Sequence, residues 1–393
     1  MKMISKKLCA SVTVAFTALA LASCGTGKEG GEAAEAEAKN FTTAEVMAQL
    51  PDYYPADYAK LIDQSRKETG LLIYGNVAEY NWREILVGFK EHYPWIKVAT
   101  LDLGPNQAFE RYYSEESSGK PGADMFVVAA PDAWLRFSET GGPAEYVSPE
   151  ADKVPDWSKP LAGVYTVAAD PMIMIYNKVL LSPEEYPTSL SQLADEAQAD
   201  PGKWRNKITT YDATSHSFAY AIHWSVVDHG KPAGWALEER LAPFTRPETG
   251  GSTMLDKVMG GEYLAAFFTS GITVFPKMNE KGRSDVLGYA LPTDGTPLML
   301  RGMAVTKSAK SPASARLLLD FMLSHEGQVD AGKGGMTPYR PDVSPDEVPF
   351  YTYSSIVKEV GGEENLVIIG YDPKMSAEYT TFIKRWGKLF KGQ

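Results

Sequence analysis

The sequence predicts an exported α/β protein that is large enough to form two lobes. The chain has 393 residues, which is enough for two hydrophobic cores. Its body alternates short apolar runs with amphipathic stretches, a pattern typical of a parallel sheet covered by helices. Its first residues add the expectation that the protein is exported.

Residues 1–23 are typical of a secretory leader. Three lysines precede an apolar run at residues 8–21, which is shorter than the ~20 apolar residues that a membrane span needs. The run closes with Leu-Ala-Ser-Cys at residues 21–24, which resembles a bacterial lipobox. We therefore expect cleavage before Cys24 and a lipid on Cys24 that anchors the protein on the periplasmic or extracellular face of a bacterial membrane. An ordinary signal peptide that ends near a cysteine is the alternative.

The segment behind the cysteine, residues 24–40, is rich in glycine, glutamate and alanine. Such a segment cannot bury enough apolar surface to offset the entropy lost on ordering. We expect a flexible linker between the lipid and a globular body that starts near Phe41. No other part of the chain is long and apolar enough to span a membrane.

Charge and cysteine content exclude several classes of protein. The net charge is −11, and cleavage of the leader would remove lysines but no acidic residue. This balance argues against a nucleic-acid partner, although a cleft can still be locally positive. Cys9 lies in the leader and Cys24 in the lipobox, so the body has no thiol. We expect no disulfide, no thiolate catalysis and no cysteine-ligated metal.

The body begins with a strand–helix–strand unit. A short helix at residues 56–68 precedes the apolar run 71–74, and an apolar stripe at helical spacing covers residues 82–89. Pro94 ends that helix and the next strand opens at 95–98. Further strands are expected at 125–128, 164–167, 172–176, 208–210, 263–268 and 286–290, and further helices at 132–138, 189–199, 217–227, 252–259, 311–322 and within 351–390.

Several stretches resemble, in their order and spacing, the solute-binding proteins of ABC importers. The resemblance points to the ferric-iron-binding-protein-like branch and spans about residues 70–342. No single motif is specific, but their order along the chain is. The stretches are Leu-Ile-Tyr-Gly at 72–75, Gly-Ala-Asp-Met-Phe at 122–126, Met-Ile-Tyr-Asn-Lys at 174–178, Tyr-Pro-Thr-Ser-Leu at 186–190, Pro-Thr-Asp-Gly-Thr at 292–296, the helix at 314–328 and Gly-Met-Thr-Pro-Tyr-Arg-Pro at 335–341.

The resemblance implies a type II two-lobed periplasmic-binding-protein fold. Two strands cross between the lobes as hinges, and the ligand cleft lies between the lobes. It further implies a monomer without a cofactor that hands a small solute to an ABC transporter permease. The expected parts are a helical extension at 41–69, a first lobe at 70–168 and 298–340, and a second lobe at 169–297 and 341–393.

The fold places the candidate ligand-binding residues. Loops at the carboxyl ends of strands, and the helix N-termini behind them, face the crevice, and helix N-termini favour anions. Plain helix caps, and for the arginine a structural salt bridge, are the alternatives. The candidates are Gly75, Asn76, Ala129, Ala130, Thr214, Ser215, His216, Ser217, Thr269, Ser270 and Arg301.

The identity of the solute is argued from departures from the iron pattern. Iron binders of the branch carry a tyrosine pair where Gly271 and Ile272 stand here, and ferric iron needs anionic oxygen ligands. We therefore expect no metal and a small anionic solute, such as a phosphonate or a sugar phosphate. A ferric-iron-binding component and a sensor protein remain alternatives. So does a two-lobed secreted enzyme, for which Asp212, Ser215 and His216 are the best available set.

The membrane anchor gives the first prediction. Cys24→Ala removes the thiol that would carry the lipid, so the protein should leave the membrane fraction and appear in the soluble one. Cys9→Ala, which alters the leader's other cysteine, should leave the distribution unchanged. Immunoblots of fractionated cells measure both, and a Cys24→Ala protein that stays in the membrane fraction would contradict the lipoprotein assignment.

Overall fold

The computed structural model describes residues 41–392 except 121 and 232. All of these residues belong to one compact unit, Lys39–Gln393. The leader, Cys24 and the linker lie outside the described residues, so the lipid anchor stays a prediction. Of the helices that are described, none has the length and apolarity needed to cross a bilayer.

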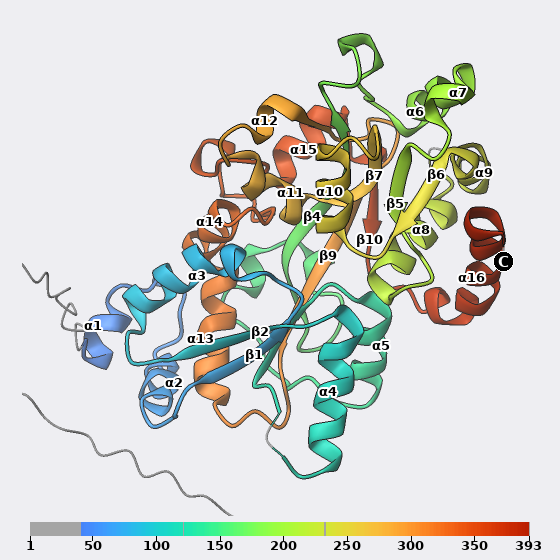
Figure 1. Cartoon of the computed structure of the whole chain (residues 1–393). Helices are drawn as coiled ribbons and strands as arrows, with labels where there is room; N and C mark the ends of the chain where they lie inside the picture. Colours follow the sequence, from blue (N-terminus) through green and yellow to red (C-terminus); the bar gives the residue numbers. More distant parts are fainter. Residues whose placement is uncertain (1–40, 121, 232, 393) are drawn as a thin grey trace, which may run out of the picture. The chain divides into compact units, whose positions relative to one another are not determined.

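Two long antiparallel strands, β4 (Tyr165–Asn177) and β9 (Thr296–Val305), run side by side through the middle of a curled sheet (Figure 1). Its strand order is β2-β1-β3-β9-β4-β7-β5-β6, with β10 beside β9 and β8 beside β4. The remaining strands are β1 (Leu71–Gly75), β2 (Val98–Asp102), β3 (Met125–Val128), β5 (Ile208–Tyr211), β6 (Thr245–Glu248), β7 (Ala265–Ser270), β8 (Leu287–Ala290) and β10 (Leu366–Ile369). This architecture confirms the two-lobed fold with two crossing strands.

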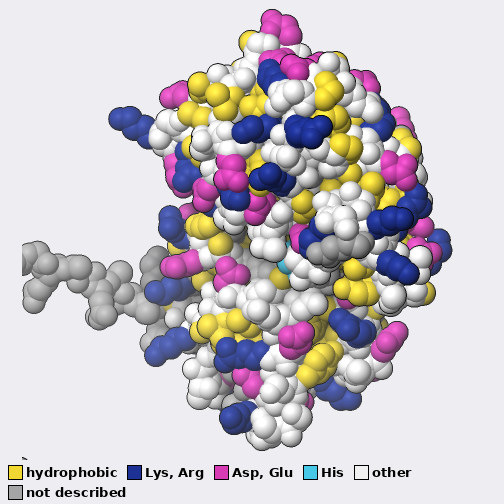
Figure 2. Space-filling view, turned by 45° about the vertical axis from the view of Figure 1, so that its right-hand side comes forward, with side chains coloured by type: hydrophobic (Ala, Val, Ile, Leu, Met, Phe, Trp, Pro, Cys, Tyr) yellow, Lys and Arg dark blue, Asp and Glu magenta, His cyan; other side chains and the backbone are white. Residues whose placement is uncertain are grey.

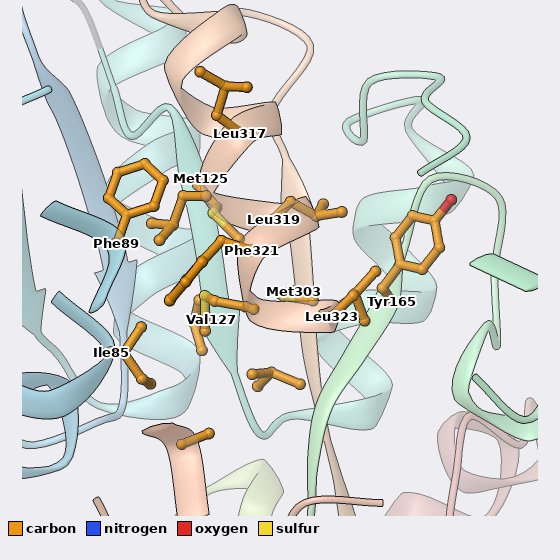
Figure 3. Close-up of a cluster of buried hydrophobic side chains, with 14 of the residues drawn as sticks. Ile85, Phe89, Met125, Val127, Tyr165, Met303, Leu317, Leu319, Phe321 and Leu323 are labelled. Carbon is orange, nitrogen blue, oxygen red and sulfur yellow. The ribbon is translucent and has the colours of Figure 1, made fainter. Parts of the chain in front are cut away.

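The first lobe is built on β1, β2 and β3, which pair in parallel. Figure 3 shows its core, where Ile85 and Phe89, Met125 and Val127, and Phe321 converge from a helix, a strand and a second helix. The helices of this lobe are α3 (Glu79–His92), α4 (Pro105–Ser117), α5 (Pro131–Glu139), α13 (Pro312–Leu323) and α14 (His325–Lys333), joined by α1 (Thr43–Met47) and α2 (Tyr58–Ser65) of the N-terminal extension.

The second lobe is built on β5, β6 and β7, and its helices lie on both faces of that part of the sheet (Figure 1). They are α6 (Leu190–Ala199), α7 (Pro201–Trp204), α8 (Ser217–His229), α9 (Trp235–Leu241), α10 (Gly251–Met259), α11 (Gly271–Met278), α12 (Arg283–Val286), α15 (Tyr353–Val360) and α16 (Lys374–Lys391). Short 3-10 turns occur at Ala151–Lys153, Asp156–Ser158, Pro183–Glu185, Ala242–Phe244, Pro345–Glu347 and Glu363–Asn365. The exact lobe boundaries expected from the sequence stay a prediction.

Several local features differ from the sequence-based expectation, among them β2, which covers Val98–Asp102 and not 95–98. The runs 164–167 and 172–176 form one strand, β4, whose pairing register shifts between Thr166 and Ala168. The strands β6 and β10 were not expected: β6 has the sequence Thr-Arg-Pro-Glu and is not apolar, whereas β10, Leu-Val-Ile-Ile, is an apolar run inside the segment 351–390 that was expected to hold helices. Both nonetheless extend the sheet, β6 at the end of the second lobe and β10 beside β9.

The start of α13 is capped by another segment of the chain. Ser311 is the N-cap residue of α13, but its hydroxyl donates to the carbonyl of Gly70 and does not cap the helix. The carboxylate of Glu68 accepts instead from the backbone amides of Ala313 at 2.9 Å and Ser314 at 2.8 Å. A carboxylate at a helix N-terminus also meets the favourable end of the helix dipole. The cap therefore ties the N-terminal extension to the first lobe.

Under the same extension lies a buried carboxylate, Asp320 of α13. Its Oδ2 accepts hydrogen bonds from the hydroxyls of Tyr58 at 2.7 Å and Tyr146 at 2.6 Å. Loss of hydration on burial raises the pKa of Asp320 from 3.8 to about 7, although these hydrogen bonds act in the opposite direction. The folded state therefore favours the neutral acid.

This buried acid predicts a pH dependence of stability. Between about pH 4 and pH 7 the folded state holds a proton on Asp320 that the unfolded state has lost, so stability falls as pH rises and levels off above 7. The full effect of raising the pKa from 3.8 to about 7 is on the order of 4 kcal/mol. Asp320→Asn cannot ionise and should flatten this part of the profile.

Chemical denaturation at a series of pH values measures the effect. Asp152→Asn, at an exposed carboxylate without a side-chain bond among the described contacts, is the matched control and should keep the wild-type slope. Equal slopes for wild type and Asp320→Asn between pH 4 and pH 7 would contradict the account.

Candidate functional site

A cavity of about 350 Å³ opens between the two lobes beside the crossing strands. Figure 2 shows the surface hollowed between an upper and a lower half. The first lobe contributes few of the lining residues and the second lobe most of them. The lining consists of Asn76, Asp102 and Pro105, then Tyr211, His216, Phe218, residues 249–253, Ser270, Ile272 and Thr273, and Arg301 on β9.

Arg301 forms the charged floor of this cavity. It is 1% exposed, and its Nε donates to Oδ2 of Asp170 on β4 at 2.8 Å. Its Nη1 donates to the backbone oxygen of Asn76 at 3.1 Å and to Oδ1 of Asn76 at 2.8 Å. Nη2 makes no hydrogen bond with any described residue. One guanidinium group therefore combines a buried salt bridge with a nitrogen that no described residue occupies.

The partners of Arg301 are fixed by the surrounding backbone. Burial raises the pKa of Asp170, and the adjacent guanidinium opposes that rise. Oδ1 of Asn76 also accepts from the amide of Ala129 at 2.9 Å. A Cβ atom at Gly75 would lie 2.7 Å from the carbonyl oxygen of Val127, so β1 and β3 approach closely only because residue 75 is glycine. Gly75, Ala129 and the fully buried Ala130 thus support the cavity without lining it.

Three helices of the second lobe begin at the cavity. These are α8, α10 and α11, whose N-cap residues are His216, Gly250 and Ser270. No side chain caps α10 or α11, so their first amides remain available, and a helix N-terminus carries partial positive charge. The hydroxyl of Ser270 is buried and has no partner among the described residues. This wall is therefore rich in hydrogen-bond donors.

His216 separates this cavity from a neighbouring one. Its Nε2 lies 3.0 Å from the carbonyl oxygen of Thr249, and its Nδ1 accepts from the amide of Ala219 at 3.2 Å. These bonds place the proton on Nε2. Burial lowers the pKa of His216, so the ring is uncharged at neutral pH. It lines both cavities without adding a positive charge to either.

The hydroxyls before α8 point elsewhere. Thr214 donates to Oδ1 of Asp212 at 2.6 Å, and Lys391 at the end of α16 donates to Oδ2 of Asp212 at 2.7 Å. Ser215 donates to the carbonyl oxygen of Asp212 at 2.6 Å. These contacts leave no serine–histidine hydrogen bond among the described residues. Asp212, Ser215 and His216 therefore lack the geometry of a catalytic triad.

The other predicted site residues are placed as follows. Ser215 and Ser217, with His216, line the neighbouring cavity of about 340 Å³. Thr214 and Thr269 line neither cavity, and Thr269 is fully buried. Of the candidates, the main cavity brings together Asn76, His216, Ser270 and Arg301.

Sequence reasoning missed Asp102, Tyr211 and the loop at residues 249–253. Each stands at or just after the carboxyl end of a strand, which is the signal that could have found them. The loop at residues 249–253 was not predicted to line the cavity because β6, the strand that precedes it, was not expected. Burial raises the pKa of Tyr211, so its side chain is a neutral phenol, and a Cβ atom at Gly251 would overlap its hydroxyl.

The two lobes also contact each other on either side of the cavity. The hydroxyl of Ser217 on α8 donates to Oδ1 of Asn106 on α4 at 2.5 Å. Asn81 on α3 donates from Nδ2 across to the carbonyl oxygen of Ile272 at 3.2 Å, and within the first lobe to that of Gly334 at 2.6 Å. These bonds hold the lobes close together around the cavity.

The fold and the cavity between its lobes define a solute-binding receptor, and comparison with known families agrees. The profile of the family described as bacterial extracellular solute-binding protein matches residues 84–353. The chain therefore belongs to the bacterial extracellular solute-binding protein family, whose members are exported binding proteins and not enzymes. No protein with a curated description matches the chain significantly.

Solved structures share the fold at low sequence identity. A substrate-binding protein of an ABC transporter from Agrobacterium tumefaciens matches with a TM-score of 0.72 and 20% identity, over 82% of this chain and 95% of its own. The periplasmic binding protein AfuA from Actinobacillus pleuropneumoniae, solved with fructose-6-phosphate bound, matches with a TM-score of 0.65 and 21% identity, over 82% of this chain and 98% of its own. Iron-bound HitA from Pseudomonas aeruginosa matches with a TM-score of 0.62 and 18% identity, over 81% of this chain and 99% of its own.

The site makes one prediction about hydroxyls. Ser270→Ala removes a buried donor that lines the cavity, whereas Thr214→Ala removes one that is bonded to Asp212 outside it. A hydrogen bond to a charged ligand is worth about 1.5–3 kcal/mol, so Ser270→Ala should weaken binding roughly ten- to a hundredfold. Thr214→Ala should not change it. Calorimetric titration with the tightest-binding small anion decides, and equal affinities of both variants and wild type would remove Ser270 from the site.

Proposed function

We propose that the protein captures a small anionic solute in the cavity between its lobes and delivers it to an ABC importer permease. The observation that carries this proposal is the combination of Arg301 with two uncapped helix N-termini, of α10 and α11, at one cavity. A guanidinium nitrogen and unpaired amides are donors that suit phosphate, phosphonate and carboxylate oxygens.

Hinge motion would couple capture to delivery. The lobes are joined by β4 and β9, and the bonds from Ser217 to Asn106 and from Asn81 to Ile272 cross between them. A solute that adds contacts to both lobes favours the closed state, and a permease that separates the lobes would release it. The proposed lipid on Cys24 would keep the protein at the membrane surface where the permease lies.

Ferric iron is the second candidate solute. Asp102 and Tyr211 line the cavity and offer oxygen atoms, and structures sharing this fold include iron-bound HitA. Against iron, the position after β7 carries Gly271 and Ile272 instead of a tyrosine pair. Burial also raises the pKa of Tyr211, which disfavours the phenolate that ferric iron prefers.

A thermal-shift screen separates the candidates. The probes are inorganic phosphate, methylphosphonate, fructose 6-phosphate, acetate and ferric citrate. We expect at least one organic or inorganic anion to raise the melting temperature, and ferric citrate to give no visible tyrosinate–iron absorption band. An orange-red band at one iron per protein, with no response to the anions, would overturn the proposal in favour of iron.

The arginine provides the matched variants. Arg301→Lys keeps a charge beside Asp170 but lacks the second terminal nitrogen, so it should lose at least roughly tenfold in affinity for the responding anion. Arg111→Lys makes the same exchange at an exposed position on α4 and should bind as wild type does. Unchanged binding by Arg301→Lys would place the anion elsewhere.

A further inference from the structure

The same cavity holds a negative charge that an anion alone does not explain. Asp102, the last residue of β2, lines the cavity together with Arg301. Its carboxylate makes no hydrogen bond and no ion pair with any described residue. It is therefore neither a helix cap nor half of a structural salt bridge.

The charge balance of the lining favours a ligand with two opposite charges. Arg301 is the one lysine or arginine in the described lining, and Asp170 at 2.8 Å already balances its charge. His216 adds no charge, because burial lowers its pKa. A ligand that carried only negative charge would be held by helix N-termini and by Nη2 of Arg301, and would be repelled by Asp102.

The surroundings of Asp102 are suited to a cation. Tyr211 and Phe218 are aromatic and line the cavity with it. Burial raises the pKa of Tyr80, on the first turn of α3, and the negative charge of Asp102 adds to that rise. Asp102 is solvent-exposed at the edge of the cavity, where partial loss of hydration raises its pKa and Arg301 opposes that rise, so its carboxylate is accessible to a ligand. The faces of aromatic rings attract cations, so Tyr211 and Phe218 add to the attraction that Asp102 exerts on an ammonium group in this cavity.

We propose that the solute is a zwitterion, whose acidic group binds at Arg301 and the N-termini of α10 and α11 and whose protonated amine pairs with Asp102. This inference rests on the proposed function and narrows its ligand class from small anions to amino acids in the wide sense, including amino-phosphonic acids. Asp102 then acts as the residue that selects for the amine.

Matched pairs of probes that differ only in the amine test the inference. The pairs are β-alanine against propionate, and aminomethyl-, 2-aminoethyl- and 3-aminopropylphosphonate against methyl-, ethyl- and propylphosphonate. Calorimetric titration of the whole protein should show at least one pair in which the amine tightens binding roughly ten- to a hundredfold, as a charge-assisted hydrogen bond would. The best chain length then reports the separation of the two charges.

Asp102→Asn should abolish that preference and bind the two members of the best pair with similar affinity. Glu116→Gln removes a negative charge from an exposed position of α4 outside the cavity and should keep the wild-type preference. Amine-free anions that bind as tightly as their amines, or a preference that survives Asp102→Asn, would overturn the zwitterion inference and leave the proposed function intact. Failure of every probe, with or without an amine, would instead contradict the proposed function itself.

Discussion

The contact between Arg301 and Asp170 is the constraint on which the site depends. It joins β9 to β4 where the two strands pair between the lobes, and both side chains are almost completely buried. A buried charge is tolerated only when it is paired and hydrogen-bonded, and Asp170, Asn76 and the amide of Thr337 supply those bonds. The arginine is therefore held rigidly, and its Nη2 is the nitrogen that has no hydrogen-bond partner among the described residues. Removing Asp170 would leave that charge uncompensated, so the crossing strands and the proposed binding site share one ion pair.

Around this fixed centre the second lobe supplies a wall of donors, and the first lobe supplies a carboxylate. The helices α8, α10 and α11 begin at the cavity because their preceding strands, β5, β6 and β7, end at the same edge of the sheet. Asp102 reaches the cavity from the end of β2. The second lobe thus presents the partial positive charge of helix N-termini and the first lobe presents Arg301 and a carboxylate, and the proposed ligand would contact both lobes on closure. Selectivity among solutes would then depend on whether the lobes can close around the solute as well as on its contacts with each lobe.

Much of the fold could be predicted from the sequence, because apolar runs and helical stripes set which segments are buried. The strand at residues 71–74 and the stripe from Trp82 to Phe89 appear where they were expected. The site was harder to predict. Small residues before helices predicted Ser270, which does line the cavity. The same pattern also predicted Thr214, but its hydroxyl donates to Asp212 and accepts from Lys391, near the end of the described chain. The contact with Lys391 joins residues far apart in the sequence and leaves no local pattern. Likewise, β6 is too short and polar to stand out, so the loop behind it could not be placed at the cavity.

The central claim is that the solute binds at the cavity floor on Arg301, between the lobes. A crystal structure of the protein with the anion that most raises its melting temperature tests this most directly. The account predicts electron density for the acidic group within hydrogen-bond distance of Nη2 of Arg301 and of the first amides of α10 or α11. Density for that anion elsewhere, for example in the pocket lined by Tyr53, Tyr54 and His325 on the first lobe, with the floor of the cavity holding only water, would contradict it.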